Sequence, residues 1–235
     1  MEPVQESGAA NESPRKIRSF VLRQGRITPA QQRAFDLYWN RYGIEYQGRP
    51  RHFDMLFRRK APLVLEIGFG NGEQLLHAAL TEYRNNFLGI EVHRPGVGRV
   101  MNALAAADVG NVRLYQHDAF EVLEHEIAPA TLSGTRIYFP DPWPKKRHHK
   151  RRLVQPDFVA LLASRMTPGG MLHLSTDWRE YAEHMRSTLD NAPAWRNSSA
   201  TGAFCEQPPW RIQTHFEQRG IRLGHAVWDL LYERR

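Results

Sequence analysis

The sequence predicts an α/β protein whose core is a doubly wound, mostly parallel sheet of about seven strands. Five short apolar runs are each followed by a segment with helical spacing, and a final stretch departs from this alternation. Strands that alternate with helices are typical of parallel sheets whose crossover helices cover both faces. At 235 residues, 41% of them hydrophobic, the chain is long enough to bury one substantial core.

We expect three regions along the chain. Residues 1–14 contain little that can be buried and lack the apolar stretch of a signal peptide, which predicts a disordered leader. Residues 15–60 are predicted to form an N-terminal extension with one helix, which starts where Thr28 can act as N-cap and Gln31 can complete a capping box. Residues 61–235 are predicted to form the main domain.

The main domain contains five successive strand-then-helix units. The expected strands are residues 63–69, 86–92, 112–116, 135–139 and 169–177, and each is followed by a helical segment. Residues 214–234 do not continue this alternation of strands and helices. They are predicted to form two strands joined by a glycine-containing turn, an antiparallel hairpin at the edge of the sheet.

The positive charge of the chain is concentrated in one place. Residues 145–152 contribute +6 of a net charge of +7, so the remainder is close to neutral. Charge runs are commonly solvated surfaces. This run, however, lies inside the main domain between a predicted strand and a predicted helix, which favours binding of a polyanion such as nucleic acid.

Cysteine usage and hydropathy exclude several classes of protein. Cys205 is the only cysteine, so an intrachain disulfide is impossible and a cytoplasmic location is expected. No apolar run approaches the roughly 18–20 residues that span a bilayer, so no membrane association is expected. We expect no bound metal, and a monomer or a homodimer.

A glycine loop follows the first predicted strand. Gly68, Gly70 and Gly72 form the pattern G-x-G-x-G, with Glu66 just before them and Glu73 where a dinucleotide-binding fingerprint requires its third glycine. Ligands of such sheets bind outside the carboxyl ends of the strands. Carboxylates beside the loop are unsuited to a pyrophosphate and suit a cationic ligand without phosphate.

S-adenosyl-L-methionine has this character, because it carries a sulfonium, an ammonium and an adenosine. Glu91 closes the second predicted strand, where an acid can bind the ribose hydroxyls, and Asp118 follows the third, where it can accept from the adenine amino group. The alternative is that both acids only cap the helices that follow them. Three acids at three successive strand ends, together with the glycine loop, favour the cofactor.

The fourth predicted strand runs into an aspartate between two prolines. Pro140 and Pro142 restrict the backbone on both sides of Asp141, so this carboxylate is held with little conformational entropy left to lose. Such restriction suits a group that must meet a substrate in a fixed geometry. Trp143, which follows, can stack on a base or simply pack against the protein.

At this point the sequence resembles a known family. The stretches "LEIGFGNGE", "GIEVHRPG", "YFPDPWPKKRHHKRRL", "LSTDW" and "THFEQRG" have the order and spacing found in bacterial tRNA (guanine-N7-)-methyltransferases, over roughly residues 17–233. The pattern FPDPWPKKRHxKRR is far more specific than the glycine loop, which class I methyltransferases share. The resemblance implies a Rossmann-like class I methyltransferase sheet with its last pair of strands antiparallel.

The resemblance also implies roles for individual residues. The implied S-adenosylmethionine site contains Glu66, the three loop glycines, Glu91, Asp118 and Asp141, and Asp141 is also implied to be catalytic. Implied substrate contacts are Lys145, Asp177, Thr214, His215, Phe216 and Glu217; implied RNA contacts are Arg147, His148, His149, Lys150, Arg151 and Arg152. His215 departs from the family pattern, which usually has a lysine there.

The implied reaction is methyl transfer to N7 of a guanine in tRNA, at position 46 in the variable loop. Two alternatives remain at this stage. A nicotinamide-dependent oxidoreductase would share the fold, although the missing third glycine argues against it. An RNA-binding module that retains the fold without catalysis would bind tRNA without methylating it.

Overall fold

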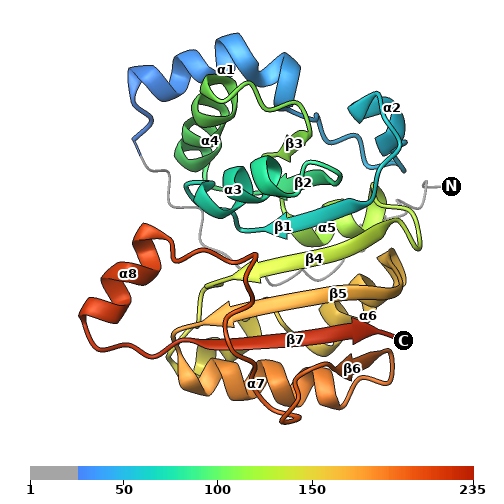
Figure 1. Cartoon of the computed structure of the whole chain (residues 1–235), viewed down its shortest axis with the longest axis vertical. Coiled ribbons are helices and arrows are strands. Elements are labelled where there is room, and N and C mark those ends of the chain that lie inside the picture. Colours follow the sequence, from blue (N-terminus) through green and yellow to red (C-terminus); the bar gives the residue numbers. More distant parts are fainter. Residues whose placement is uncertain (1–25) are drawn as a thin grey trace, which may run out of the picture.

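The structure, a computed structural model, describes residues 26–235, so the predictions for the leader and for the start of the extension lie outside the described residues. The described chain forms a seven-stranded sheet between two layers of helices (Figure 1). No helix in this part is long and apolar enough to cross a membrane.

The sheet has the strand order β3-β2-β1-β4-β5-β7-β6. The first five strands pair in parallel, whereas β7 runs antiparallel between β5 and β6. Their bounds are β1 Leu63–Ile67, β2 Asn86–Ile90, β3 Val112–Tyr115, β4 Leu132–Tyr138, β5 Met166–Thr176, β6 Trp195–Asn197 and β7 Trp228–Arg234. The order reverses between β1 and β4, which is where open α/β sheets bind their ligands.

Helices cover both faces of the sheet, as the alternation of elements predicts. One core cluster contains residues of α1, α3 and α4, and the other contains residues of α2, α5, α6 and α7. Their bounds are α1 Pro29–Tyr42, α2 Phe53–Phe57, α3 Glu73–Thr81, α4 Arg94–Ala106, α5 Ala119–His125, α6 Pro156–Arg165, α7 Arg179–Asp190 and α8 His215–Arg222. The five predicted strand-then-helix units are therefore confirmed.

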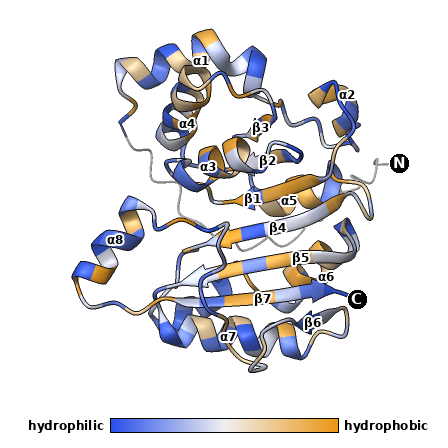
Figure 2. Cartoon of the chain, in the orientation of Figure 1, coloured by the Kyte–Doolittle hydropathy of each residue, from blue (hydrophilic) through white to orange (hydrophobic). Residues whose placement is uncertain are grey.

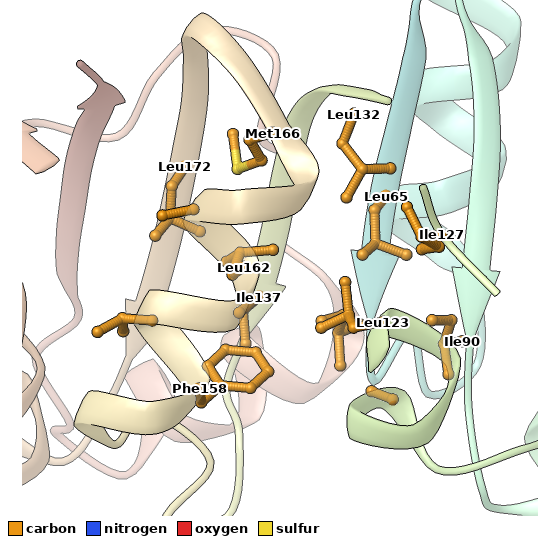
Figure 3. Packing of buried hydrophobic residues seen from close by; sticks show 14 of the residues in the cluster. Leu65, Ile90, Leu123, Ile127, Leu132, Ile137, Phe158, Leu162, Met166 and Leu172 are labelled. Carbon is orange, nitrogen blue, oxygen red and sulfur yellow. The ribbon is translucent and has the colours of Figure 1, made fainter. Parts of the chain in front are cut away.

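The larger core cluster is built from apolar residues on one face of the strands. Figure 3 shows Leu65 of β1 beside Leu132 and Ile127, and Ile137 of β4 between Leu162 and Phe158 of α6. Figure 2 shows β1 as almost wholly hydrophobic, whereas hydrophilic residues interrupt β4 and β5. Glu66 of β1, Arg136 of β4 and His173 of β5 are buried polar residues that lie side by side in the sheet, on the face opposite to this cluster.

The helix predicted in the N-terminal extension is confirmed as α1. The Thr28 hydroxyl accepts from the Gln31 amide, and the Gln31 side chain accepts from the Thr28 amide, which completes the predicted capping box. A Cβ atom on Gly98 of α4 would lie 2.9 Å from the Gln31 backbone oxygen, so glycine permits this close helix contact. The extension, which is predicted to have one helix, also contains the short helix α2.

The predicted C-terminal hairpin is wrong in its first half. The Thr214 hydroxyl accepts from the Glu217 amide and starts helix α8 where a strand was expected. The last strand, β7, is antiparallel as predicted, but it pairs with β5 and with the three-residue strand β6. Thr214 and Glu217 have the spacing of a capping box, a helix signal that outweighs the short apolar alternation.

Candidate active site

A cleft of about 600 Å³ opens at the carboxyl ends of β1, β2, β3 and β4. Its walls are Gly68 after β1, Glu91 after β2, His117 and Ala119 after β3, and residues 138–144 after β4. Figure 1 shows β1, β4 and β5 pointing toward the side on which α8 lies. The structure thus brings the glycine loop, Glu91 and Asp141 into one cleft, as the sequence predicts.

The three glycines of the loop have different physical roles. All three have positive φ angles, 72° at Gly68, 55° at Gly70 and 78° at Gly72, which other residues rarely adopt. A Cβ atom on Gly68 or Gly70 would meet nothing within 4 Å, so the backbone there faces open space. On Gly72 it would lie 2.1 Å from Val100 of α4, so this glycine permits close helix packing.

Glu91 ties the glycine loop to the end of β2. Its Oε2 accepts from the Gly70 amide at 2.9 Å, and its Oε1 accepts from the amides of Val92 and His93 at 2.8 and 2.9 Å. The carboxylate therefore binds amides of the glycine loop and of the two residues before α4, while it also lines the cleft; it does not bind the first turn of α4, so the capping alternative does not describe this residue. Its role toward a ribose stays a prediction.

Asp118 caps helix α5. Its Oδ1 accepts from the Phe120 amide at 2.9 Å, so the capping alternative describes a real interaction of this side chain. The residues on either side of it, His117 and Ala119, line the cleft. The position at the end of β3 is as predicted, and the contact with an adenine stays a prediction.

Glu66 lies inside β1, only 2% exposed, on a second cavity of about 260 Å³ that adjoins the cleft. In the described part of the chain, its buried Oε2 has no hydrogen-bond partner. Burial raises the pKa of this carboxyl to about 8, although the charge of Arg136 opposes the shift. Arg136 is itself bound to Glu82 through two contacts of 2.8 Å. The unpaired oxygen therefore suits a ligand that brings its own hydrogen-bond donor or positive charge.

The loop that carries Asp141 is held in a strained backbone conformation. Phe139 and Trp143, neither of them a glycine, have φ angles of 50° and 46°, a conformation that costs roughly 1–3 kcal/mol at each residue. The Pro142 carbonyl accepts from the Arg152 guanidinium at 2.9 Å. The exposed carboxylate of Asp141 thus sits on a loop fixed by prolines and by this hydrogen bond.

The basic run forms a short 3₁₀ helix, η1 (Lys146–Arg151), beside the cleft. Lys145, Lys146, Arg147 and Lys150 are exposed, as binding of phosphates requires. Arg151 instead places its guanidinium 5.0 Å from the ring centroid of Trp143, and His148 meets the same ring edge-on at 5.8 Å. Trp143 is therefore packed within this segment while it also lines the cleft.

Arg152 corrects the prediction that the whole run contacts RNA. It is only 3% exposed, because its guanidinium donates to the Pro142 carbonyl and to Glu180 and lies over the ring of Tyr181. His149 is half-buried and lies 3.3 Å from Glu180. Arg152 therefore supports the Asp141 loop from inside the protein, and its charge does not face solvent.

Of the predicted substrate residues, Thr214 and Phe216 line the second cavity, whereas Lys145, Asp177, His215 and Glu217 line neither cavity. Asp177 follows β5, and its Oδ2 lies 3.1 Å from the Nδ1 of His225. The exposed His215 donates its backbone amide to Glu73 at 2.9 Å, which ties the start of α8 to the start of α3. Phe216 is 59% exposed and lines the second cavity, with its ring 5.4 Å from that of Phe139.

Glu217 differs from the other predicted substrate residues because it is buried and bound to Arg211. Arg211 and Gln74 are two residues of the site that the sequence does not reveal. Arg211 lies in an irregular segment, and Gln74 is an unremarkable helix residue whose side chain binds the backbone of Trp210 and Ile212. Their partners lie on other elements, so only the fold brings them together.

The strand order, the glycine loop and the cleft define a Rossmann-like methyltransferase. The fold resembles that of the 16S rRNA methyltransferase KamB, with a TM-score of 0.57 at 14% identity over 78% of this chain and 93% of that one. It also resembles TrmN from Thermus thermophilus, with a TM-score of 0.54 at 17% identity over 87% and 48% of the two chains.

The sequence comparisons narrow the class to a family. A family model described as "Putative methyltransferase" matches residues 60–230. A tRNA (guanine-N(7)-)-methyltransferase of Xanthomonas campestris pv. campestris (strain 8004) is 57% identical over 95% of this chain and 85% of its own length. One of Xylella fastidiosa (strain 9a5c) is 55% identical over 95% and 92%. The chain belongs to the tRNA (guanine-N7-)-methyltransferase family.

Proposed function

We propose that this protein transfers a methyl group from S-adenosylmethionine to N7 of a guanine in tRNA, at position 46 in the variable loop. The observation that carries the proposal is the placement of Asp141. Its carboxylate lies on a fixed loop at the cleft, directly beside a cationic helix whose exposed Lys and Arg residues suit phosphates. The relatives in Xanthomonas and Xylella are named tRNA (guanine-N(7)-)-methyltransferases, which supports the base and the atom of the proposal.

The residues of the cleft fit S-adenosylmethionine, which when bound supplies an electrophilic methyl group on a positively charged sulfur. Gly68 and Gly70 leave open space in front of the loop, and Glu91 is in place at the end of β2. Glu66 offers a buried, unpaired carboxyl oxygen. We assign Asp118 and Asp141 to the same site. The carboxylate of Glu73, in the place of the third glycine of the dinucleotide fingerprint, disfavours the pyrophosphate of a nicotinamide cofactor.

The reaction at guanine N7 needs no base, because this nitrogen carries a free lone pair. The chain's task is to orient the guanine and to stabilise the positive charge that develops on its ring. A fixed carboxylate does this by the same electrostatic logic as an oxyanion hole, with the sign reversed. We assign this role to Asp141, whose exposed carboxylate lies on the wall of the cleft, whereas Glu217 is buried and bound to Arg211.

The cationic helix would hold the RNA that carries the guanine. N7 faces the major groove, which in A-form RNA is too deep and narrow for side chains to enter. The target must therefore be an accessible or everted base. Lys146, Arg147 and Lys150 are exposed beside the cleft and would bind the flanking phosphates.

The test is the substitution Asp141→Ala, assayed by transfer of a labelled methyl group to bulk tRNA. We expect the turnover rate to fall by roughly 100-fold or more, while the Kd for tRNA stays within a few-fold, because the phosphate contacts remain. Asp157→Ala, at an exposed position in the first turn of α6, is the matched control and should transfer methyl groups normally. Full activity in Asp141→Ala would refute the assignment. Tight tRNA binding by the unaltered protein without any methyl transfer would favour the binding-module alternative.

A further inference from the structure

A buried ion-pair network joins helix α8 to strand β7. Arg211 lies in the segment between β6 and α8 and is 4% exposed. Its Nη1 donates to Glu217 of α8 at 2.5 Å, and its Nη2 donates to Asp229 of β7 at 2.9 Å. One guanidinium is therefore shared between two buried carboxylates on different elements. The planar fork of arginine suits this geometry, which a lysine cannot reproduce.

The hydrogen bonds continue across β5 to Tyr138, the last residue of β4, which leads into the loop that carries Asp141. Asp229 also accepts from Ser175 at 2.5 Å, and its Oδ1 lies 2.9 Å from Nε2 of His173. The indole of Trp210 can only donate, and it points at Nδ1 of His173 at 3.3 Å. Nδ1 is therefore the acceptor, and the ring proton lies on Nε2, which donates to Asp229. Tyr138 then donates to the same Nδ1 at 2.9 Å.

Asp229 is charged and His173 is neutral in this network. Burial alone would raise the pKa of Asp229, but hydrogen bonds from His173 and Ser175 and the charge of Arg211 outweigh it and lower that pKa. Burial lowers the pKa of His173, although Asp229 opposes the shift, so the imidazole is neutral near pH 7. Asp229 is thus a buried anion paired with Arg211, and His173 connects it to Tyr138.

Arg211 lies behind the active site, close to one residue of the loop that carries Asp141 and bound to one residue of α8. Its guanidinium lies 5.9 Å from the ring centroid of Phe139, the residue before Pro140 and Asp141. The ring of Phe139 in turn contacts Phe216 of α8. Through Glu217 and through Phe139, the same side chain is therefore linked to α8, whose Phe216 lines the second cavity, and to the loop that carries Asp141 and lines the cleft.

The segment around Arg211 is held against helix α3 by two hydrogen bonds. The Gln74 amide of α3 donates to the Trp210 carbonyl at 2.9 Å and accepts from the Ile212 amide at 2.8 Å. Buried ion pairs contribute little net stability compared with apolar residues of similar volume. Stability alone therefore does not account for a shared arginine here, whereas the need for one fixed arrangement of α8 and the catalytic loop does.

We propose that Arg211 is a positioning residue for methyl transfer. It fixes α8, with Phe216, relative to the loop that carries Asp141, so that the bound guanine meets this carboxylate in the productive geometry. The proposal rests on the proposed function, and Arg211 acts through Glu217 and Phe139 without touching the substrate.

The test compares Arg211→Lys with the unaltered protein at saturating tRNA and S-adenosylmethionine. The lysine keeps the positive charge but cannot bridge both carboxylates. We expect kcat to fall about 10- to 100-fold, since small misplacements at a reacting centre cost this much. The KM for tRNA and the Kd for S-adenosylhomocysteine should change less than about 3-fold, because the cationic helix and the glycine loop are unaltered. Amide hydrogen exchange should rise in residues 214–224.

Arg113→Lys is the matched control. Arg113 is a partly buried arginine of β3 whose guanidinium donates to the carbonyls of Leu56 and Gly110, and its substitution should leave kcat unchanged. Glu217→Gln is a milder second variant that keeps the side-chain shape, and it should lower kcat by about 3- to 10-fold with the same unchanged KM.

Three outcomes would overturn the proposal. These are a normal kcat in both Arg211→Lys and Glu217→Gln, a loss that appears only in the KM for tRNA, or a loss that merely follows the fraction of unfolded protein. In each of these cases the unaltered protein and Arg113→Lys still methylate tRNA, which separates this failure from failure of the proposed function. If the unaltered protein transfers no methyl group to tRNA, the proposed function itself is wrong, and the positioning role falls with it.

Discussion

The raised pKa of Glu66 predicts how the stability of the ligand-free protein changes with pH. Burial raises this pKa from 4.5 to about 8, because the charged carboxylate loses its hydration inside the sheet. Arg136 offsets only part of this cost, since its guanidinium is bound to Glu82. The perturbation is Glu66→Gln, which keeps the shape of the side chain and removes its ionisation.

The direction of the effect follows from proton binding. Between pH 4.5 and about 8 the folded protein keeps a proton on Glu66 that the unfolded chain has released. Stability therefore falls as the pH rises through this window and levels off above it. At about 1.4 kcal/mol per pH unit, the loss between pH 6 and pH 9 amounts to about 2–3 kcal/mol. For a protein of this size that corresponds to a lowering of the Tm by roughly 5–10 °C.

The assay is thermal unfolding of the unaltered protein and of Glu66→Gln, each at pH 6 and at pH 9 without ligand. The difference between the two Tm values isolates Glu66, because all other groups titrate in both proteins. We expect the Tm of Glu66→Gln, relative to that of the unaltered protein, to be roughly 5–10 °C higher at pH 9 than at pH 6. Glu206→Gln, at an exposed position, should show no such movement. The same Tm difference at both pH values would refute the reasoning.

Two further predictions concern the basic run. The triple substitution of Lys146, Arg147 and Lys150 by Ala should weaken tRNA binding. The slope of log Kobs against log salt concentration, measured by titration at several salt concentrations, should become shallower by roughly 0.7–0.9 for each phosphate that the variant no longer binds. An unchanged slope would mean that the basic run is a solvated surface. Arg152→Met should leave that slope unchanged and lower the free energy of unfolding by about 1–3 kcal/mol, because the buried guanidinium supports the Pro142 carbonyl. A reduced salt slope in Arg152→Met would show that this residue binds phosphate after all.

The sequence predicts those parts of the fold that depend on local pattern. The alternation of apolar runs with helical segments predicts the five strand-then-helix units, and the capping box at Thr28 predicts the start of α1. The same kind of signal at Thr214 competes with an apparent strand alternation, which is why the sequence predicts a strand where α8 lies. Strand β6 has only three residues, too few for a periodic pattern.

The candidate site is predictable where residues follow strand ends, because the fold class alone places those positions together. Asp141 and Glu91 lie where the parallel sheet predicts. Burial is much less predictable from sequence. Arg152 belongs to a run of exposed cations but is inside the protein, and Glu217 belongs to a predicted substrate segment but is bound to Arg211. These environments arise from contacts between elements distant in the chain.

The measurement that tests the central claim most directly is the position of the methyl group after the protein acts on bulk tRNA. The protein is incubated with tRNA and labelled S-adenosylmethionine, and the modified nucleotide is mapped by nuclease digestion and mass spectrometry. We expect the label in 7-methylguanosine, at position 46 in the variable loop. A methyl group on a different base, or on a different atom of guanine, would contradict the account, as would tRNA that binds and stays unmethylated.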